Sequence, residues 1–262
     1  MSAPPHADPG RGVFETMLVI AGRAVELDAH LERLTTSVET LYGSALPDNA
    51  RALVAGRVGK IEWGKLRLAA MPARRGVQLE VNGGEIDSDS VFPTAERGAA
   101  LRTRVVAGGL GEHKWADRDL LDSLAARSPG ELPLLLDADG AVLEASRASV
   151  FTVDGERLIT PPADGSILPS IARRQAIEAA DAEGIETDEE RLTVTDLLSR
   201  EVFLTGSVRG VEPAISLDDA ALAPPGEISE RLAAGLRSRW QVPAGEPAAA
   251  VAAAPPSGRP GR

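Results

Sequence analysis

Three lysines, Lys60, Lys65 and Lys114, are the only lysine amines in this 262-residue chain, and its other 25 basic residues are arginines. A lysine amine can bond covalently to a carbonyl compound and can carry protons. Chemistry of this kind therefore has three candidates. The chain has no cysteine, which excludes a thiolate nucleophile, a disulfide framework and a cysteine-ligated metal. Its three histidines are too few to favour a zinc site, so we expect no metal.

The charge and hydropathy of the chain exclude further classes of protein. With 28 basic and 39 acidic residues the formal charge is -11, which argues against a dedicated nucleic-acid binder. No apolar run approaches the roughly 20 residues that span a bilayer. The first residues, MSAPPHADPGRG, lack the basic and apolar regions of a signal peptide. We therefore expect a cytoplasmic protein that binds neither membrane nor nucleic acid.

The elements that must position any reactive residue lie within residues 11–242. Five apolar residues at spacings of three and four predict a helix that Asp28 caps and Gly43 ends: Leu27, Leu31, Leu34, Val38 and Leu41. Other helices are predicted at 49–59, 115–127, 170–184 and 228–241, the last with Ile228, Leu232, Leu236 and Trp240 on one face. Strands are predicted at 13–20, 65–70, 77–83, 101–107, 132–137, 141–146, 149–153, 157–162 and 201–207. Helices and strands do not alternate strictly, so the pattern favours an α+β fold with antiparallel or mixed sheets over a Rossmann domain.

The same pass divides the chain into four parts. Residues 1–10 read as a loose start, and 11–107 as a small N-terminal α+β domain. Gly108-Gly109 is a plausible junction, after which 108–242 forms a larger C-terminal domain. Residues 243–262, rich in Ala and Pro, are predicted to be a disordered tail.

Five stretches in a fixed order carry the strongest signal. They are GVFETMLVIAGRAVELDAHLERL (12–34), HKWADR (113–118), LLLDADGAVLEASRASVFTV (134–153), ITPPADGSILPSIARR (159–174) and EVFLTGSVRGVEPA (201–214). Together they resemble the class IV, or fold type IV, pyridoxal-phosphate enzymes: branched-chain aminotransferase, D-amino-acid aminotransferase and 4-amino-4-deoxychorismate lyase. The resemblance implies a two-domain fold like that of D-amino-acid aminotransferase, with pyridoxal 5'-phosphate as cofactor in the larger domain.

This resemblance gives the three lysines unequal weight. Lys114 stands where the family's lysine holds the cofactor covalently and moves protons, whereas Lys60 and Lys65 are interpreted as surface residues. Glu144, in VLEAS, matches the glutamate that keeps the pyridine nitrogen protonated, which lets the ring act as an electron sink.

The resemblance also implies a site for the cofactor phosphate at the start of a helix, where free amides and the helix dipole favour an anion. The matching residues are Ser170, Ile171 and Ala172, with Arg33 and Ser207 contributing from elsewhere. Members of the family usually have Gly and Thr where this chain has Ser170 and Ala172. Ser170 is therefore expected to replace the lost hydroxyl, to cap the helix, or both.

Two arginines, Arg118 and Arg209, are candidates for binding a substrate carboxylate. With the segment SVRGVEP they make the chain most similar to 4-amino-4-deoxychorismate lyase, which releases pyruvate and 4-aminobenzoate. The alternatives are a branched-chain or D-amino-acid aminotransferase and a degenerate, non-catalytic homologue. The resemblance further implies a homodimer that acts on a small molecule, either aminodeoxychorismate or an amino acid. Aminodeoxychorismate synthase would be its functional partner.

Overall fold

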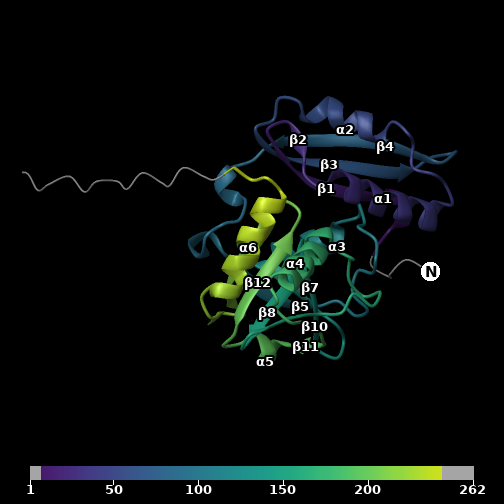
Figure 1. The fold of residues 1–262 in the computed structure, drawn as a ribbon. Coiled ribbons are helices and arrows are strands. Elements are labelled where there is room, and N and C mark those ends of the chain that lie inside the picture. The colour runs from purple at the N-terminus through teal and green to yellow at the C-terminus, as the bar shows by residue number, and fades with distance from the viewer. Residues whose placement is uncertain (1–6, 244–262) are drawn as a thin grey trace, which may run out of the picture.

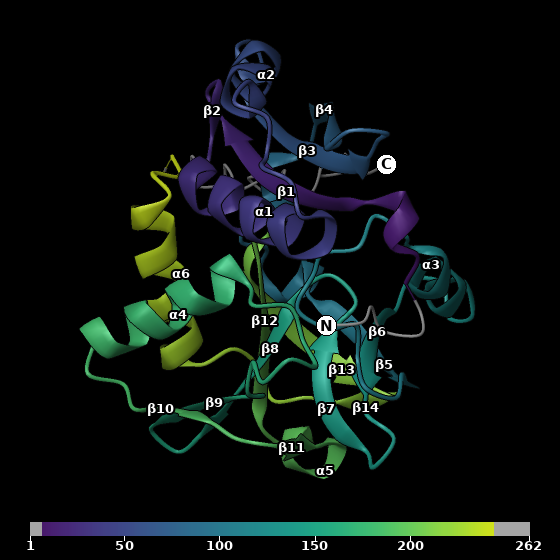
Figure 2. The same cartoon turned by 90° about the vertical axis from the view of Figure 1, so that its right-hand side faces the viewer.

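The computed structural model describes residues 7–243, which form two β-sheets with helices on their outer faces (Figures 1 and 2). The α1 and α2 helices cover the smaller sheet, and α4 and α6 lie together against the larger one. This arrangement confirms the α+β fold with antiparallel and mixed sheets.

The smaller sheet is antiparallel and has four strands in the order β2-β1-β3-β4. Its central strand β1 is covered on both faces. Met17 and Val19 pack with the α1 and α2 side, whereas Leu18 and Ile20 belong to the core of the larger unit. The elements are β1 (Val13–Ile20), β2 (Arg23–Ala24), α1 (Leu27–Tyr42), α2 (Ala50–Val58), β3 (Trp63–Pro72) and β4 (Val77–Glu85).

The larger sheet is mixed and follows the order β10-β9-β8-β12-β13-β5-β6-β7-β11, with β14 beside β13. β5 runs parallel to both β6 and β13, and β9 runs parallel to β10. Its strands are β5 (Ala99–Val105), β6 (Leu132–Leu136), β7 (Ala141–Ala145), β8 (Ser149–Asp154), β9 (Arg157–Thr160), β10 (Thr187–Glu189), β11 (Leu192–Thr193), β12 (Glu201–Gly206), β13 (Gly210–Leu217) and β14 (Ala220–Ala221). The helices that accompany it are α3 (Asp119–Ala126), α4 (Ile171–Ala182), α5 (Val194–Leu197) and α6 (Glu227–Arg239). Short 3-10 turns form at η1 (Pro9–Arg11), η2 (Ser88–Ser90) and η3 (Ala95–Arg97).

The core between the larger sheet and its helices follows the predicted helix face. Leu232 and Leu236 of α6 and the following Trp240 are fully buried, and they pack with α4 and the sheet. Phe151 of β8 and Phe203 of β12 stack at a centroid distance of 5.2 Å. Phe92, Phe151, Phe203 and Trp240 thus supply the aromatic part of this core.

Several boundaries differ from the sequence prediction. Asp28 is not the cap of α1, because the helix begins at Leu27 after Glu26, which has a left-handed conformation at φ 54°. Gly43 ends α1 in the left-handed conformation, as predicted. α3 begins only at Asp119, because the preceding Trp115 is buried and bridges to Val13 of β1.

Other differences concern whole segments. β13 was not predicted, because Pro213 lies inside it and proline is unfavourable within a sheet. Pro9–Arg11, part of the predicted loose start, forms a 3-10 turn that Asp8 caps. β5 pairs with strands of the larger sheet, so the change of sheet falls between β4 and β5, ahead of Gly108. The division into domains stays a prediction, and the predicted tail lies, after its first residue, outside the described range.

Within residues 7–243, no helix combines the length and the apolar character that crossing a membrane requires. No group of three or more His, Asp and Glu side chains in that range is placed to hold a metal ion.

Candidate active site

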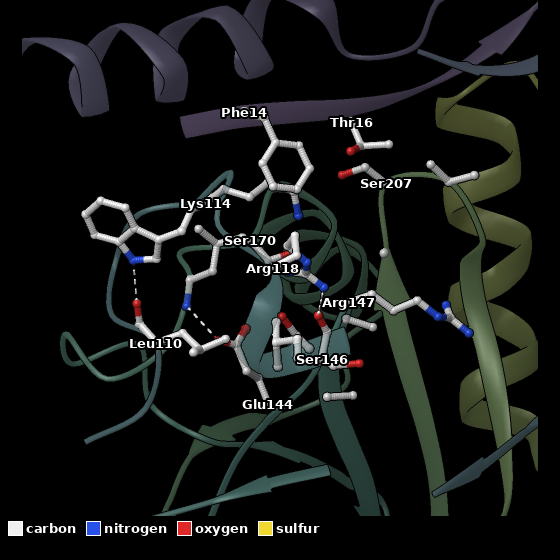
Figure 3. Close-up of a pocket in the computed structure, with 18 of the residues that line it drawn as sticks. Phe14, Thr16, Leu110, Lys114, Arg118, Glu144, Ser146, Arg147, Ser170 and Ser207 are labelled. Carbon is white, nitrogen blue, oxygen red and sulfur yellow. Dashed lines mark hydrogen bonds between the residues drawn. The ribbon is translucent and has the colours of Figure 1, made fainter. Parts of the chain in front are cut away.

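A cavity of about 450 Å³ lies between the two sheets and collects most of the residues singled out in the sequence (Figure 3). β1 and β3 contribute Phe14, Thr16 and Lys65 from the smaller sheet. The larger unit contributes segments 110–121, 144–149, 168–170 and 206–209. Among the predicted site residues, Lys114, Glu144, Arg33, Ser170, Ser207, Arg118 and Arg209 line the cavity, whereas the buried side chains of Ile171 and Ala172 do not.

Lys114 is fixed by backbone contacts to the first strand. Its carbonyl accepts a hydrogen bond from the Phe14 amide at 2.9 Å, and its Nζ lies 5.1 Å from the centre of the Phe14 ring. Burial, aided by the positive charge of Arg33, lowers the pKa of Lys114 to about 8. The unprotonated amine, which a nucleophile or base requires, is therefore more abundant near neutral pH than for an ordinary lysine, at roughly a tenth of the molecules.

Glu144 projects from β7 and is 7% exposed. Within the described residues its carboxylate accepts one long hydrogen bond, from the Leu168 amide at 3.4 Å, and forms no ion pair. Burial raises the pKa of Glu144 to about 7. A buried carboxylate loses its contacts with water, and here a single long hydrogen bond replaces them. Such a group is suited to bind a positively charged atom of a ligand.

The start of α4 has free backbone amides, and such a helix start favours an anion. Ser170 is the N-cap, and its hydroxyl accepts a hydrogen bond from the Arg173 amide at 3.3 Å. The capping role expected of Ser170 is therefore present, and its side chain also reaches the cavity wall. Ile171 and Ala172 begin the helix, so only their backbone amides are relevant to a ligand.

Arg33 reaches this helix start from α1. Its Nη1 donates to the carbonyl of Pro169 at 3.0 Å, while Nε and Nη2 donate to the two carboxylate oxygens of Glu15 at 2.8 and 2.7 Å. Nδ1 of His30 lies 2.6 Å from the same carboxylate. Burial alone would raise the pKa of Glu15, but Arg33 and His30 outweigh it and lower the pKa to about 2.

Glu15 and His30 were missed by the sequence analysis. The available signal was a single carboxylate inside the apolar strand that contains Phe14 and Met17. Its partner Arg33 is 18 residues away, and only the fold shows that the two meet.

The two predicted carboxylate-binding arginines occupy different surroundings. Arg118 is largely buried, which lowers its pKa, and its Nη2 donates to the Ser146 carbonyl at 2.8 Å. Arg209 pairs with Glu212 at 2.8 Å, and Arg147, which the sequence analysis did not single out, pairs with the same carboxylate. Lys65 is exposed, as its strand pattern predicted, but it lines the cavity, so the interpretation of a plain surface residue was incomplete.

Comparison with known proteins identifies the class. Residues 12–217 match the model of the amino-transferase class IV family. A bifunctional aminodeoxychorismate lyase / D-amino acid transaminase of Mycobacterium tuberculosis is 30% identical over 254 residues, which cover 83% of this chain and 87% of that protein. The branched-chain-amino-acid aminotransferase of Escherichia coli K12 is 29% identical over 162 residues, covering 62% of this chain and 48% of its own length.

Solved structures agree with this result. A hypothetical aminotransferase from Mycobacterium tuberculosis in its PLP-bound form superposes with a TM-score of 0.77 at 25% identity, covering 92% of this chain and 93% of the other. The 4-amino-4-deoxychorismate lyase of Pseudomonas aeruginosa shares the fold, with a TM-score of 0.74 at 22% identity over 91% and 95% of the two chains.

These findings first define a pyridoxal-phosphate-dependent enzyme with the type IV fold. More specifically, the chain belongs to the class IV aminotransferase family. The resemblance noted in the sequence is confirmed at that level, and the comparisons include both lyases and aminotransferases.

The donor set fits this cofactor. Pyridoxal phosphate presents an aldehyde, a ring nitrogen and a phosphate, which need an amine, a carboxylate and an anion site. The cavity offers the buried amine of Lys114, the weakly compensated carboxylate of Glu144 and the open start of α4 beside Arg33.

Proposed function

We propose that the protein is a 4-amino-4-deoxychorismate lyase, which converts its substrate to 4-aminobenzoate and pyruvate. When bound, the cofactor supplies an electron sink for the charge that develops beside the substrate amine. Lys114 holds the cofactor, Glu144 keeps its ring nitrogen protonated, and Arg33, Ser207 and the 170–172 amides hold its phosphate.

Lys114 is the base of the proposed reaction. Its amine would take the proton from ring carbon C4 of the bound substrate. The bond between C3 and the ether oxygen then breaks, the ring becomes aromatic, and Lys114 returns a proton to the departing enolpyruvate. The atoms of 4-aminobenzoate and pyruvate together equal those of the substrate, so the reaction needs neither an oxidant nor an amino acceptor. A pKa of about 8 suits a group that must both take and return a proton.

The observation that carries this proposal is the positive charge on the substrate side of the cavity. After Lys114 and Arg33 are assigned to the cofactor, four basic side chains still line the cavity: Lys65, Arg118, Arg147 and Arg209. Aminodeoxychorismate has two carboxylates, one on the ring and one on the enolpyruvyl group, so its charge suits such a wall. The bifunctional relative of Mycobacterium tuberculosis, whose name includes the lyase activity, also supports the proposal.

The second candidate is an amino-acid aminotransferase. The same relative is also named a D-amino acid transaminase, and other relatives are branched-chain aminotransferases. The third, a non-catalytic homologue, has less support, because the amine of Lys114 and the carboxylate of Glu144 are both kept at the cavity with pKa values near neutrality.

The deciding experiment gives the purified, cofactor-loaded protein enzymatically made aminodeoxychorismate without any keto acid. Release of pyruvate and 4-aminobenzoate is the expected result. In parallel, D-alanine or L-leucine is supplied with 2-oxoglutarate. Glutamate formation in that assay, with no pyruvate from aminodeoxychorismate, would replace the lyase by the aminotransferase. The homodimer, the cytoplasmic location and the link to aminodeoxychorismate synthase stay predictions.

A further inference from the structure

Glu212 is a buried carboxylate that joins two turns of the cavity wall. It lies on β13, and its side chain is 2% exposed. Arg147, in the turn between β7 and β8, donates through Nη1 and Nη2 to its two oxygens at 2.9 and 3.0 Å. Arg209, in the turn between β12 and β13, bonds to it at 2.8 Å. Both arginines line the cavity, whereas Glu212 lies behind them.

The geometry places two guanidinium groups side by side. The Nη2 atoms of Arg147 and Arg209 both contact the same oxygen, Oε1 of Glu212. Without the carboxylate, two like charges at this spacing would repel each other. Glu212 therefore determines that both arginines are held at one place on the wall, and Figure 3 shows Arg147 next to Ser146 there.

The charges in this group do not cancel. One carboxylate faces two guanidinium groups, which leaves one positive charge at the cavity surface. The side chains of Arg147 and Arg209 remain 40% and 26% exposed, so they are accessible from the cavity. Nε of Arg209 is buried and has no hydrogen-bond partner within residues 7–243.

A second ion-pair cluster in the same sheet, built around one arginine, serves as a structural comparison. Arg102 on β5 is surrounded by carboxylates, with Glu131 at 2.7 Å and Asp219 at 2.8 Å. There, acidic groups outnumber the base and the cluster is away from the cavity. At Glu212 the bases outnumber the acid, and the surplus charge faces the cavity.

We propose that Glu212 is a positioning residue that holds Arg147 and Arg209 as a clamp, and that this clamp binds a substrate carboxylate remote from the reacting amine. The proposal rests on the proposed function, because it deepens the choice of a substrate with two carboxylates. It adds Arg147 and Glu212 to the residues that determine specificity. On aminodeoxychorismate, the remote group is the ring carboxylate, opposite the amine.

The test measures how the cofactor-loaded protein binds two probes of nearly equal shape. 4-Aminobenzoate carries an amine and a carboxylate at opposite ends, and 4-aminobenzamide replaces the charge by a neutral amide. The wild type should prefer the carboxylate. Arg147→Gln should weaken 4-aminobenzoate binding by about 10- to 100-fold, the range for a hydrogen bond to a charged group, without changing 4-aminobenzamide binding. Arg147→Lys, which keeps the charge, should restore part of the preference.

Glu212→Gln keeps both arginines at the cavity wall but removes the carboxylate that positions them, so it tests the positioning role separately from the arginine charges. It should weaken 4-aminobenzoate binding by roughly tenfold and raise KM for aminodeoxychorismate more than it lowers kcat. The matched control is Glu131→Gln, which removes the partner of Arg102 far from the cavity and should leave both probes unchanged. Visible absorption of the bound cofactor and the Tm of each variant show that it is folded and loaded.

The outcomes separate this inference from the function on which it rests. Equal affinity of the wild type for both probes would overturn the clamp, and so would an equal loss of both in Glu212→Gln. Pyruvate release without probe discrimination refutes the clamp and keeps the lyase. Discrimination that depends on Arg147 and Glu212, with no pyruvate release, keeps the clamp and refutes the lyase.

Discussion

Glu15 and Glu144 are both buried beside the same cavity, yet their pKa values move in opposite directions. Glu15, 1% exposed, accepts hydrogen bonds from Arg33 and lies against His30, and its pKa falls to about 2. Glu144, 7% exposed, has one long contact with an amide, and its pKa rises to about 7. Burial raises the pKa of both carboxyls, so the opposite directions come from the partners that the protein supplies.

The comparison distinguishes two uses of a buried acid. At Glu15 the fold completes the ion pair itself, and the result is a fixed arginine at the start of α4. At Glu144 the fold supplies no ion-pair partner within the described residues, and under the proposed function a protonated ring nitrogen of the cofactor would supply the positive charge. Glu15, which orients Arg33, thus has its positive partners within the protein. Glu144, which would face the cofactor under the proposed function, has no positive partner of its own within the described residues.

Removing Lys114 should produce the largest effect. Lys114→Ala should lose the covalently bound cofactor, with its visible absorption, and lower the catalytic rate by about 1,000-fold or more, because the base is gone. The fold should persist, since the fixing contacts of this residue are made by its backbone. Lys65→Ala is the matched control and should keep the absorption. If Lys114→Ala kept it, the cofactor would be attached elsewhere.

Breaking the completed pair should mainly affect stability. Glu15→Gln leaves a buried His30 and a nearly buried Arg33 without their carboxylate, so the free energy of unfolding should fall by about 3 kcal/mol. Denaturant titration measures this change. Glu32→Gln, on the exposed side of the same helix, should change stability by less than about 0.5 kcal/mol. If Glu15→Gln were as stable as the control, the ion pair of Glu15 would make no net contribution to the free energy of unfolding.

The two acids should also differ in pH dependence in the cofactor-free protein. The lowered pKa of Glu15 contributes stability that is present above pH 4.5 and is lost as the pH falls toward about 2. The raised pKa of Glu144 has the opposite sign: its contribution is complete below pH 4.5 and is lost as the pH rises to about 7. Glu144→Gln cannot ionise, so relative to it the wild type should lose at most about 3 kcal/mol over that range. A pH-independent difference between the two proteins would contradict the raised pKa.

Changing the helix cap should have the smallest effect. Ser170→Ala removes the hydroxyl that accepts from the Arg173 amide, so stability should fall by about 1 kcal/mol. Cofactor affinity should fall only a few-fold, because the backbone amides and Arg33 remain. Ser170→Asp, which keeps a cap but adds a negative charge, should weaken cofactor binding more than Ser170→Ala does. If Ser170→Ala weakened cofactor binding more than Ser170→Asp does, the phosphate would not bind at this helix start.

Residues that belong to a recurring sequence pattern are predicted well from the sequence. Residues whose role depends on a partner distant in the sequence are predicted poorly. α1 follows from its apolar spacing, which is a local signal, and Lys114 and Glu144 follow from the ordered motifs that resemble a known family. Glu15 and Glu212 have no such signal. Each is a single acid in an apolar strand. Arg33 is 18 residues from Glu15. Although Arg209 is only three residues from Glu212, the second partner Arg147 is 65 residues away.

The same limit explains the misplaced boundaries. The cap of α1 depends on a left-handed Glu26, a conformation that sequence patterns disfavour outside Gly and Asn. The late start of α3 depends on Trp115, which the tertiary bridge to Val13 draws out of the helix. The cavity-facing position of Lys65 depends on which face of β3 meets the larger unit.

The contact between Arg33 and the Pro169 carbonyl joins the two halves of the molecule at the point where an anion is expected. Arg33 belongs to the helix over the smaller sheet, and Pro169 precedes the helix on the larger one. A ligand that bridges them binds only while the halves are together, so by mass action it adds RT ln(1 + [L]/Kd) to the cost of separating them. The cofactor of this enzyme would then act as a joint between two layers, and its concentration would set the temperature at which they come apart.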